Sequence, residues 1–266
     1  MKIQATLDKA KANRGNMFAE TPGQKAAGGE DGSAFDAVVN LPEYSKSRHV
    51  RFVPDVLEKN RCVSIFPDAE ATNSYKMLKK QIQQKTEGDR KNTIMITGVR
   101  EGDGSSLTSA NLAVTFAREL HQTVLLVDCD LRSQKIHKCF GYESRMGLAD
   151  YLTDNKALSE LIVWPGIEKL TVISGGQDLP DSTEFLGSKR MGHLVDEMKN
   201  RYEERYVLFD VPPVLDRADA LAFSPFVDGI VMVVSVGKTS RRDIKRALGL
   251  FDREKIIGLV LNRITH

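Results

Sequence analysis

The stretch that decides the fold reads Thr97-Gly98-Val99-Arg100-Glu101-Gly102-Asp103-Gly104-Ser105-Ser106-Leu107. It follows an apolar run at residues 93–96 and precedes a helix-compatible segment at 109–117. A strand, a glycine-rich turn and a helix in this order typically hold phosphates with backbone N–H groups and a helix N-terminus. Such a loop normally ends in Gly-Lys-Ser/Thr, whereas here Gly104 is followed by Ser105 and Ser106. The hydroxyl that binds magnesium is therefore present, but serine replaces the lysine that meets the terminal phosphates.

Length and composition exclude several classes of protein. The 266 residues suffice for one α/β domain with a buried core and additional segments. The formal net charge of +2 gives no indication of nucleic-acid or membrane binding. Cys62, Cys129 and Cys139 have neither the even number of a disulfide framework nor the spacing of a zinc site. Because no apolar run approaches about 18 residues and no signal-peptide pattern is present, we expect a soluble, cytoplasmic protein without a nucleic-acid partner.

The N-terminal part differs in pattern from the rest of the chain. We expect a short amphipathic helix at residues 1–12, then a flexible linker at 13–34 that is rich in Gly, Ala, Lys and Glu. Residues 40–61 have the composition of an irregular, polar arm. We therefore divide the chain into an N-terminal segment with a flexible arm, residues 1–56, and a domain with the phosphate-binding loop, residues 57–266.

Apolar and helical segments alternate regularly after this arm. Strands are predicted at 93–97, 123–127, 169–173, 206–210, 229–235 and 256–261. Helices are predicted at 69–85, 106–120, 183–202, 216–224 and 239–251, the last capped by Thr239 or Ser240 together with Asp243. Nearly continuous apolar strands indicate a sheet that is covered on both faces. We predict an α/β fold with a doubly wound, mostly parallel sheet flanked by helices, in which ligands bind at the carboxyl ends of the strands.

Acidic side chains stand at two of these carboxyl ends. The apolar residues 124–127 lead into Asp128 and Asp130, and residues 206–209 lead into Asp210. An aspartate after four apolar residues is the Walker B pattern, whose carboxylate holds magnesium directly or through water. A single aspartate after a strand is more often a helix or turn cap. Two such positions downstream of a glycine-rich turn instead favour a metal and phosphate site.

Four motifs, taken in order, resemble those of a known family. They are Glu101-Gly102-Asp103-Gly104-Ser105-Ser106, Asn111-Leu112-Ala113, Asp128-Cys129-Asp130-Leu131-Arg132 and Asp210-Val211-Pro212-Pro213. The set resembles the cytoplasmic P-loop domain of bacterial tyrosine kinases (BY-kinases), which serve capsule and exopolysaccharide assembly and belong to the MinD/ParA-like ATPases. The resemblance runs from about Leu57 to Arg263. Each motif is weak alone, and the ordered set is specific.

This resemblance implies roles for individual residues. It places ATP or ADP with Mg²⁺ on a loop formed by Gly102, Asp103, Gly104, Ser105, Ser106 and Leu107. Ser106 is then the magnesium hydroxyl, and Asp128 is the carboxylate near the γ-phosphate that activates the attacking group. Asp130 lies beside it, and Asp210 completes the metal shell. Asn262 occupies the position at which relatives meet the adenine edge, although a turn residue after the last strand explains it equally well.

Several departures from the family pattern bear on activity. Ser105 replaces the lysine, and Glu101 replaces a proline and brings a negative charge to the phosphate loop. A helix that reads Glu-x-x-Arg-x-x-Arg in the family has Asn73, Lys76 and Lys79 here. Because lysine lacks the bidentate fork of arginine, we expect weakened self-association. The sequence also ends without the tyrosine cluster that these kinases phosphorylate, so we expect no phosphorylation of such a tail.

Arg100 occupies the place of the second, "signature" lysine of MinD-like loops. One interpretation makes it a substitute for the missing lysine. The other, which is the more common situation, makes it a solvated arginine in a turn.

Three functions remain open. The first is a BY-kinase-like protein of exopolysaccharide or capsule biosynthesis and export, with impaired catalysis, weak or no ATP binding and a regulatory role. The second is an active ATP-dependent protein-tyrosine autokinase, which requires Arg100 as the cation and an acceptor such as Tyr44. The third is a MinD/ParA-like positioning ATPase, against which the sequence has no C-terminal amphipathic membrane helix.

The resemblance also implies a partner for this protein. We expect a membrane polysaccharide co-polymerase or chain-length regulator that recruits the protein to the inner face of the cell membrane. The arm before Leu57 and the helix at 69–85 are the expected contact surfaces, because neither belongs to the strand–helix alternation.

Overall fold

A computed structural model gives the structure of residues 48–50, 54–66, 70–88, 91–154 and 156–264. The expected N-terminal helix and linker lie outside the described residues. All described residues belong to one compact unit that spans Asn40–His266.

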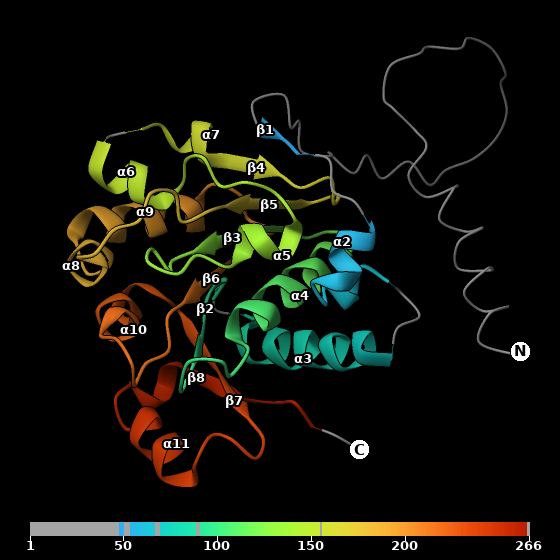
Figure 1. Cartoon of the computed structure of the whole chain (residues 1–266), viewed down its shortest axis with the longest axis vertical. Coiled ribbons are helices and arrows are strands. Elements are labelled where there is room, and N and C mark those ends of the chain that lie inside the picture. The colour runs from blue at the N-terminus through green and yellow to red at the C-terminus, as the bar shows by residue number, and fades with distance from the viewer. Residues whose placement is uncertain (1–47, 51–53, 67–69, 89–90, 155, 265–266) are drawn as a thin grey trace, which may run out of the picture. The chain divides into compact units, whose positions relative to one another are not determined.

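A sheet of eight strands forms the centre of this described part of the chain (Figure 1). In spatial order the strands are β1 (Arg48–His49), β4 (Ile162–Trp164), β5 (Leu170–Ile173), β3 (Thr123–Asp128), β6 (Arg205–Val211), β2 (Thr93–Gly98), β7 (Gly229–Ser235) and β8 (Ile256–Asn262). All neighbours pair in parallel except β4 and β5, which are antiparallel. The predicted mostly parallel sheet is confirmed, whereas the short strands β1 and β4 were not predicted.

Helices cover both faces of the sheet (Figure 1). The α-helices are α2 (Pro54–Lys59), α3 (Glu70–Thr86), α4 (Ser105–Ala117), α5 (Ile136–Phe140), α6 (Leu148–Asp154), α7 (Leu158–Leu161), α8 (Ser182–Leu186), α9 (Lys189–Asn200), α10 (Asp219–Phe223) and α11 (Arg241–Leu248). Single 3₁₀ turns are η2 (Val63–Ile65), η3 (Ser224–Phe226) and η4 (Arg253–Lys255). Across the residues that the structure describes, none of the helices combines the length and the apolar character that a membrane crossing requires.

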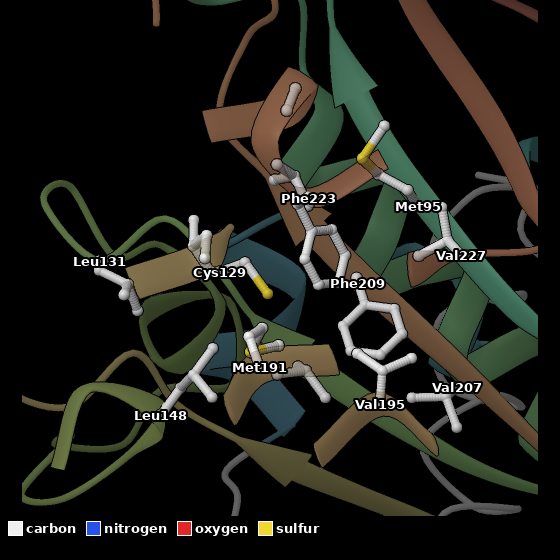
Figure 2. Close-up of a cluster of buried hydrophobic side chains, with 14 of the residues drawn as sticks. Met95, Cys129, Leu131, Leu148, Met191, Val195, Val207, Phe209, Phe223 and Val227 are labelled. Carbon is white, nitrogen blue, oxygen red and sulfur yellow. The ribbon is translucent and has the colours of Figure 1, made fainter. Parts of the chain in front are cut away.

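The central strands are buried on both faces because alternate residues enter two different cores. Met95 of β2 packs with α9 and α10 on one face, and its neighbours Ile94 and Ile96 pack with α3 and α4 on the other. Figure 2 shows the first of these cores, in which the rings of Phe209 and Phe223 meet edge to face with centroids 4.9 Å apart. This three-layer packing explains why the apolar runs of the sequence are nearly continuous.

Two predictions about helices were wrong in detail. The helix predicted at 183–202 is two helices, α8 and α9, because Ser188 caps a new helix by accepting a hydrogen bond from the Met191 N–H at 3.2 Å. The segment 54–59, predicted to be irregular, forms α2, and its apolar residue Leu57 is buried against the core. The expected domain boundary after residue 56 falls inside α2 and stays a prediction.

The cap of the last helix was predicted correctly in one of its two versions. Ser240 caps α11 and accepts a hydrogen bond from the Asp243 N–H at 3.0 Å. Thr239, the alternative cap, contacts the phosphate loop instead. Its hydroxyl donates to the Asp103 carboxylate at 2.6 Å.

Candidate functional site

The loop between β2 and α4 has the conformation of a phosphate-binding turn. Gly102 and Gly104 have φ angles of +82° and +93°, a region in which side chains are strained. A Cβ on Gly104 would also collide with the amide of Asn262. α4 begins at Ser105, so its free N–H groups face the loop. Backbone shape and helix orientation therefore match what an anion such as a phosphate requires.

The side chain of Asp103 holds this loop in shape. It is buried, accepts from the Arg100 N–H at 2.8 Å and accepts from the Thr239 hydroxyl at 2.6 Å. The amide of Asn262 donates to the Asp103 carbonyl at 2.8 Å. Thr239, which follows β7, and Asn262, the last residue of β8, thus fix the loop from outside. Sequence reasoning placed Asp103 and Asn262 at the site but did not foresee that they bind each other.

Two aspartates lie side by side beneath the loop. Asp128 ends β3, Asp210 lies in β6, and the two residues are direct partners in the sheet. Burial raises the pKa of Asp128 to about 7, although three N–H groups, from Asp130, Lys135 and Ile136, bond its carboxylate. Burial, and then the neighbouring Asp128, raise the pKa of Asp210. In the absence of a cation, the pair resists carrying two negative charges.

Hydroxyl groups of α4 contact the second of these aspartates. Ser109 donates to Asp210 at 2.9 Å, and the Ser106 hydroxyl lies close enough to this carboxylate to lower its pKa, against the larger rise that burial causes. Ser106 and Asp210 are therefore adjacent, as their expected joint role in metal binding requires. Leu107 lies in the same first turn and offers its carbonyl to the side chain of Asn111 at 2.9 Å.

Asp130 has a different environment, because a cation contacts it. The Arg217 Nη2 lies 2.5 Å from the Asp130 Oδ1, and the same oxygen accepts from the Ser133 N–H at 3.0 Å. The Asp130 side chain is 5% exposed and the Arg217 side chain 20% exposed. Of the three expected catalytic acids, Asp130 is the one with an ion pair inside the described chain.

Ser105 stands where the lysine was expected, and Arg100 does not take its place. The Arg100 guanidinium binds Asp216 at 2.9 Å and Asp243 at 3.2 Å. These hydrogen bonds raise the pKa of Arg100 and hold its charge on two carboxylates. The structure thus supports the interpretation of Arg100 as a turn residue, here an anchored one.

A polar pocket of about 460 Å³ opens beside the loop. It is lined by Glu101, Asp130, Arg132, Ser133, Lys135, Asp178, Pro213, Asp216 and Arg217. Arg217 and Asp216 were not predicted from the sequence. They follow the Asp-x-Pro-Pro motif, at the start of the helix predicted at 216–224. The structure begins α10 only at Asp219, so both residues lie in the turn before it, and no motif marked them as site residues.

The residues present fit a nucleotide with magnesium in most respects. Among the described residues, no group of three or more His, Cys, Asp or Glu side chains forms a metal cage. Mg²⁺ commonly takes one or two carboxylates and completes its shell with water and phosphate oxygens. The Ser106 hydroxyl with Asp128 and Asp210 supplies this donor set, and the glycine turn supplies the cradle. The feature that does not fit is the missing loop cation.

The fold and this site are those of a P-loop domain. A family model described as "AAA domain" matches residues 91–248. The tyrosine-protein kinase YwqD of Bacillus subtilis is 31% identical over 208 residues, which cover 77% of this chain and 86% of that protein. The chimerical protein CapA2B2 aligns with a TM-score of 0.72 at 26% identity, covering 85% of this chain and 96% of that one.

A further solved structure shares the fold of this chain. MinD complexed with Mg-ADP from Pyrococcus horikoshii aligns with a TM-score of 0.54 at 23% identity, covering 64% of this chain and 70% of that one. That likeness supports the fold alone. The family model and the similarity to YwqD together show that this chain belongs to the bacterial tyrosine-protein kinase family of P-loop proteins.

Proposed function

We propose that this protein is a BY-kinase-like regulator of exopolysaccharide or capsule biosynthesis and export, impaired in catalysis, with weak or no ATP binding. One observation carries the proposal: the phosphate loop keeps its shape while Ser105 stands in the place of its lysine. The cradle is built by Asp103, Thr239 and Asn262, none of which depends on that lysine.

The size of the interaction lost with the loop lysine predicts weakened nucleotide binding, not its complete loss. A hydrogen bond to a charged group contributes about 1.5–3 kcal/mol, or roughly ten- to hundredfold in affinity. Backbone N–H groups and the magnesium ligands can still hold a nucleotide at reduced affinity. Phosphoryl transfer depends more heavily on charge, because the protein acts mainly by positioning and electrostatic stabilisation. The negative charge of Glu101 on the same loop adds to the deficit.

The acids have assigned roles in this proposal. Ser106, Asp128 and Asp210 hold Mg²⁺, which neutralises charge on the phosphates when it is bound. The raised pKa values of the buried aspartates fit such a site, since a divalent cation restores their ionised forms. Asp130 stands at the pocket wall, and its carboxylate is oriented by the Ser133 N–H.

One observation favours an active autokinase as the second candidate. All three expected acids, Asp128, Asp130 and Asp210, lie together at the carboxyl ends of β3 and β6. A protein without catalysis does not need all three. The MinD/ParA-like positioning ATPase has less support, because the resemblance to MinD is weaker than that to CapA2B2.

For a partner, we propose a membrane polysaccharide co-polymerase or chain-length regulator that brings this protein to the inner face of the cell membrane. Weak self-association leaves room for such a hetero-complex. Of the three positions that differ from the family's self-association motif, Lys79 forms an ion pair with Glu119 of its own chain. Lys79 stands at the position of an arginine that the family uses between subunits, and here its charge is paired within the chain.

Calorimetry of purified protein tests the central claim. We expect Mg-ADP and Mg-ATP to bind weakly or not measurably, and Ser105→Lys to raise affinity about ten- to hundredfold. Ser105→Ala is the matched control and should leave affinity unchanged. Tight wild-type binding that Ser105→Lys does not alter would contradict the proposal.

A phosphotyrosine assay separates the first two functions. With ATP and Mg²⁺, purified wild type should accumulate no phosphotyrosine. A signal that disappears in Asp128→Asn would establish the active autokinase instead.

A further inference from the structure

The missing lysine raises the question of which cation meets the terminal phosphate. Four other cations lie near the loop. Arg100 is held by two carboxylates, and Lys238 donates to the Glu101 carbonyl at 3.0 Å. Arg132 lines the pocket as an exposed residue, and Lys135 lines it with its ammonium 3.9 Å from the exposed Glu101 carboxylate. Arg100 and Lys238 are held but do not line the pocket. Within the described part of the chain, Arg132 and Lys135 line the pocket without a close, buried counter-ion.

Arg217 combines the two properties, a place in the pocket wall and a buried counter-ion. It lines the pocket, its side chain is 20% exposed, and Asp130 fixes its guanidinium at 2.5 Å. The contact is with a single Asp130 oxygen in the described structure, so the guanidinium retains other N–H donors. An arginine in this state can bind a phosphate oxygen without first leaving its carboxylate.

The segment that carries Arg217 is tied to the phosphate loop. The Val214 N–H donates to the Gly98 carbonyl at 3.0 Å, and the Leu215 N–H donates to the Val99 carbonyl at 3.2 Å. Asp216 accepts from the Glu101 N–H at 2.7 Å. Three hydrogen bonds thus set the position of this segment relative to the loop. A cation on it keeps a constant distance from whatever the loop holds.

We propose that Arg217 binds the terminal phosphate of a nucleoside triphosphate at this site and supplies part of the charge absent at Ser105. The inference rests on the proposed nucleotide-binding function and adds to it a preference for triphosphate over diphosphate. Asp130 is the resting counter-ion of Arg217. Planar N–H pairs suit a phosphate as well as a carboxylate, so the same guanidinium can serve both.

The role differs from that of a lysine within the loop. A loop lysine follows the backbone turn and meets the terminal phosphates from the side of the helix. Arg217 instead comes from the segment that follows β6, and it lines the pocket beside the loop. We expect it to contact a phosphate that extends from the loop into this pocket, as the last phosphate of a triphosphate would and those of a diphosphate would not.

Binding measurements on the full chain test the proposal. Affinities for Mg-ADP and for a non-hydrolysable Mg-ATP analogue are measured in wild type, Arg217→Gln and Arg217→Lys, each also in the Ser105→Lys background. We expect Arg217→Gln to weaken the triphosphate analogue about tenfold with little change for ADP. Arg217→Lys should fall between. Arg132→Gln and Lys135→Gln, two other cations of the same pocket, are the matched controls and should change the ratio little.

The outcomes separate this proposal from the one on which it rests. If Arg217→Gln weakens both nucleotides equally, Arg217 has only a structural role as the partner of Asp130, and the proposal fails. An unchanged ratio in the Ser105→Lys background also overturns it, while nucleotide binding stands. If even Ser105→Lys binds neither nucleotide, nucleotide binding itself is wrong, and the role of Arg217 falls with it.

Discussion

The two edges of the sheet use the same residue type in opposite ways. At the amino edge, Asp228 precedes β7 and accepts hydrogen bonds from the N–H groups of Asn92 and Thr93 and from the Thr93 hydroxyl. Lys199 lies 2.5 Å from its other oxygen. At the carboxyl edge, Asp128 and Asp210 are fully buried and the structure shows no cation paired with either among the described residues.

The pKa values follow this difference in surroundings. Partial burial opposes ionisation of Asp228, but hydrogen bonds from Lys199 and Thr93 outweigh it and hold its pKa below the usual range. Burial instead raises the pKa of Asp128 and of Asp210. An aspartate with its partners inside the chain stabilises the fold. Buried aspartates with no cationic partner among the described residues, such as Asp128 and Asp210, are kept at the expense of stability, which is typical of a functional site.

The largest effect is expected at the amino edge. Asp228→Asn should lower the free energy of unfolding by about 3 kcal/mol, because it leaves Lys199 partly buried without its counter-ion. Urea unfolding at pH 7 measures the change. Asp196→Asn, at an exposed acid on α9, is the control and should change little. A loss no larger than that of the control would remove the contrast between the edges.

The same variant has a predicted pH dependence. The folded pKa of Asp228 is lowered, so its contribution is present above the unfolded pKa of about 3.9 and is lost as the pH falls through the folded value. The difference between wild type and Asp228→Asn should therefore be constant from about pH 5 to 8 and shrink below about pH 4. A difference that grows on acidification would contradict the assignment.

An effect of opposite sign is expected at the carboxyl edge. In the ligand-free protein, Asp210→Asn should raise the free energy of unfolding at pH 8 by roughly 1 kcal/mol, because it removes a charge that burial disfavours. Asparagine keeps an acceptor for Ser109 and can donate to Ser106. Because the folded pKa of Asp210 is raised, the free energy of unfolding of the wild type should fall as the pH rises above the unfolded pKa of about 4, and Asp210→Asn should remove this decrease. Unfolding with and without Mg-ADP checks both effects, and destabilisation at pH 8 would show Asp210 to be structural.

The smallest effect sharpens the comparison within the carboxyl edge. Ser240 caps α11 close to the loop, so Ser240→Ala should lower the free energy of unfolding by about 1 kcal/mol. Nucleotide affinity should stay unchanged, and Ser240→Asp should retain most of the stability. A change in affinity would mean that the cap also shapes the phosphate loop through its neighbour Thr239.

Periodic patterns account for what could be predicted from the sequence. Runs such as 229–235 are apolar because both faces are covered, and their bounds matched the strands closely. β1 and β4 have two and three residues, too short for any period. The break between α8 and α9 depends on a cap at Ser188 that lies inside an otherwise helical pattern.

The candidate site was predictable where a motif carries it. Asp128 and Asp210 follow strands, and the glycine turn has a recognisable spacing. The contact between Asp130 and Arg217 joins residues 87 positions apart, so only the fold brings them together. The pairing of Arg100 with two acids is likewise a tertiary property. Sequence reasoning could name that arginine but not find its partners.

The hydrogen bonds that hold Asp103 have a consequence for how readily the site can change by mutation. Residues from three separate segments maintain the geometry of the phosphate loop, namely Asp103, Thr239 and Asn262. The missing lysine, in contrast, depends on the single position Ser105. A mutation at position 105 therefore need not disturb the fold of the loop, and one further substitution can restore the lysine. Chains of this kind can therefore gain or lose the loop lysine without rebuilding the fold, as long as Asp103, Thr239 and Asn262 remain.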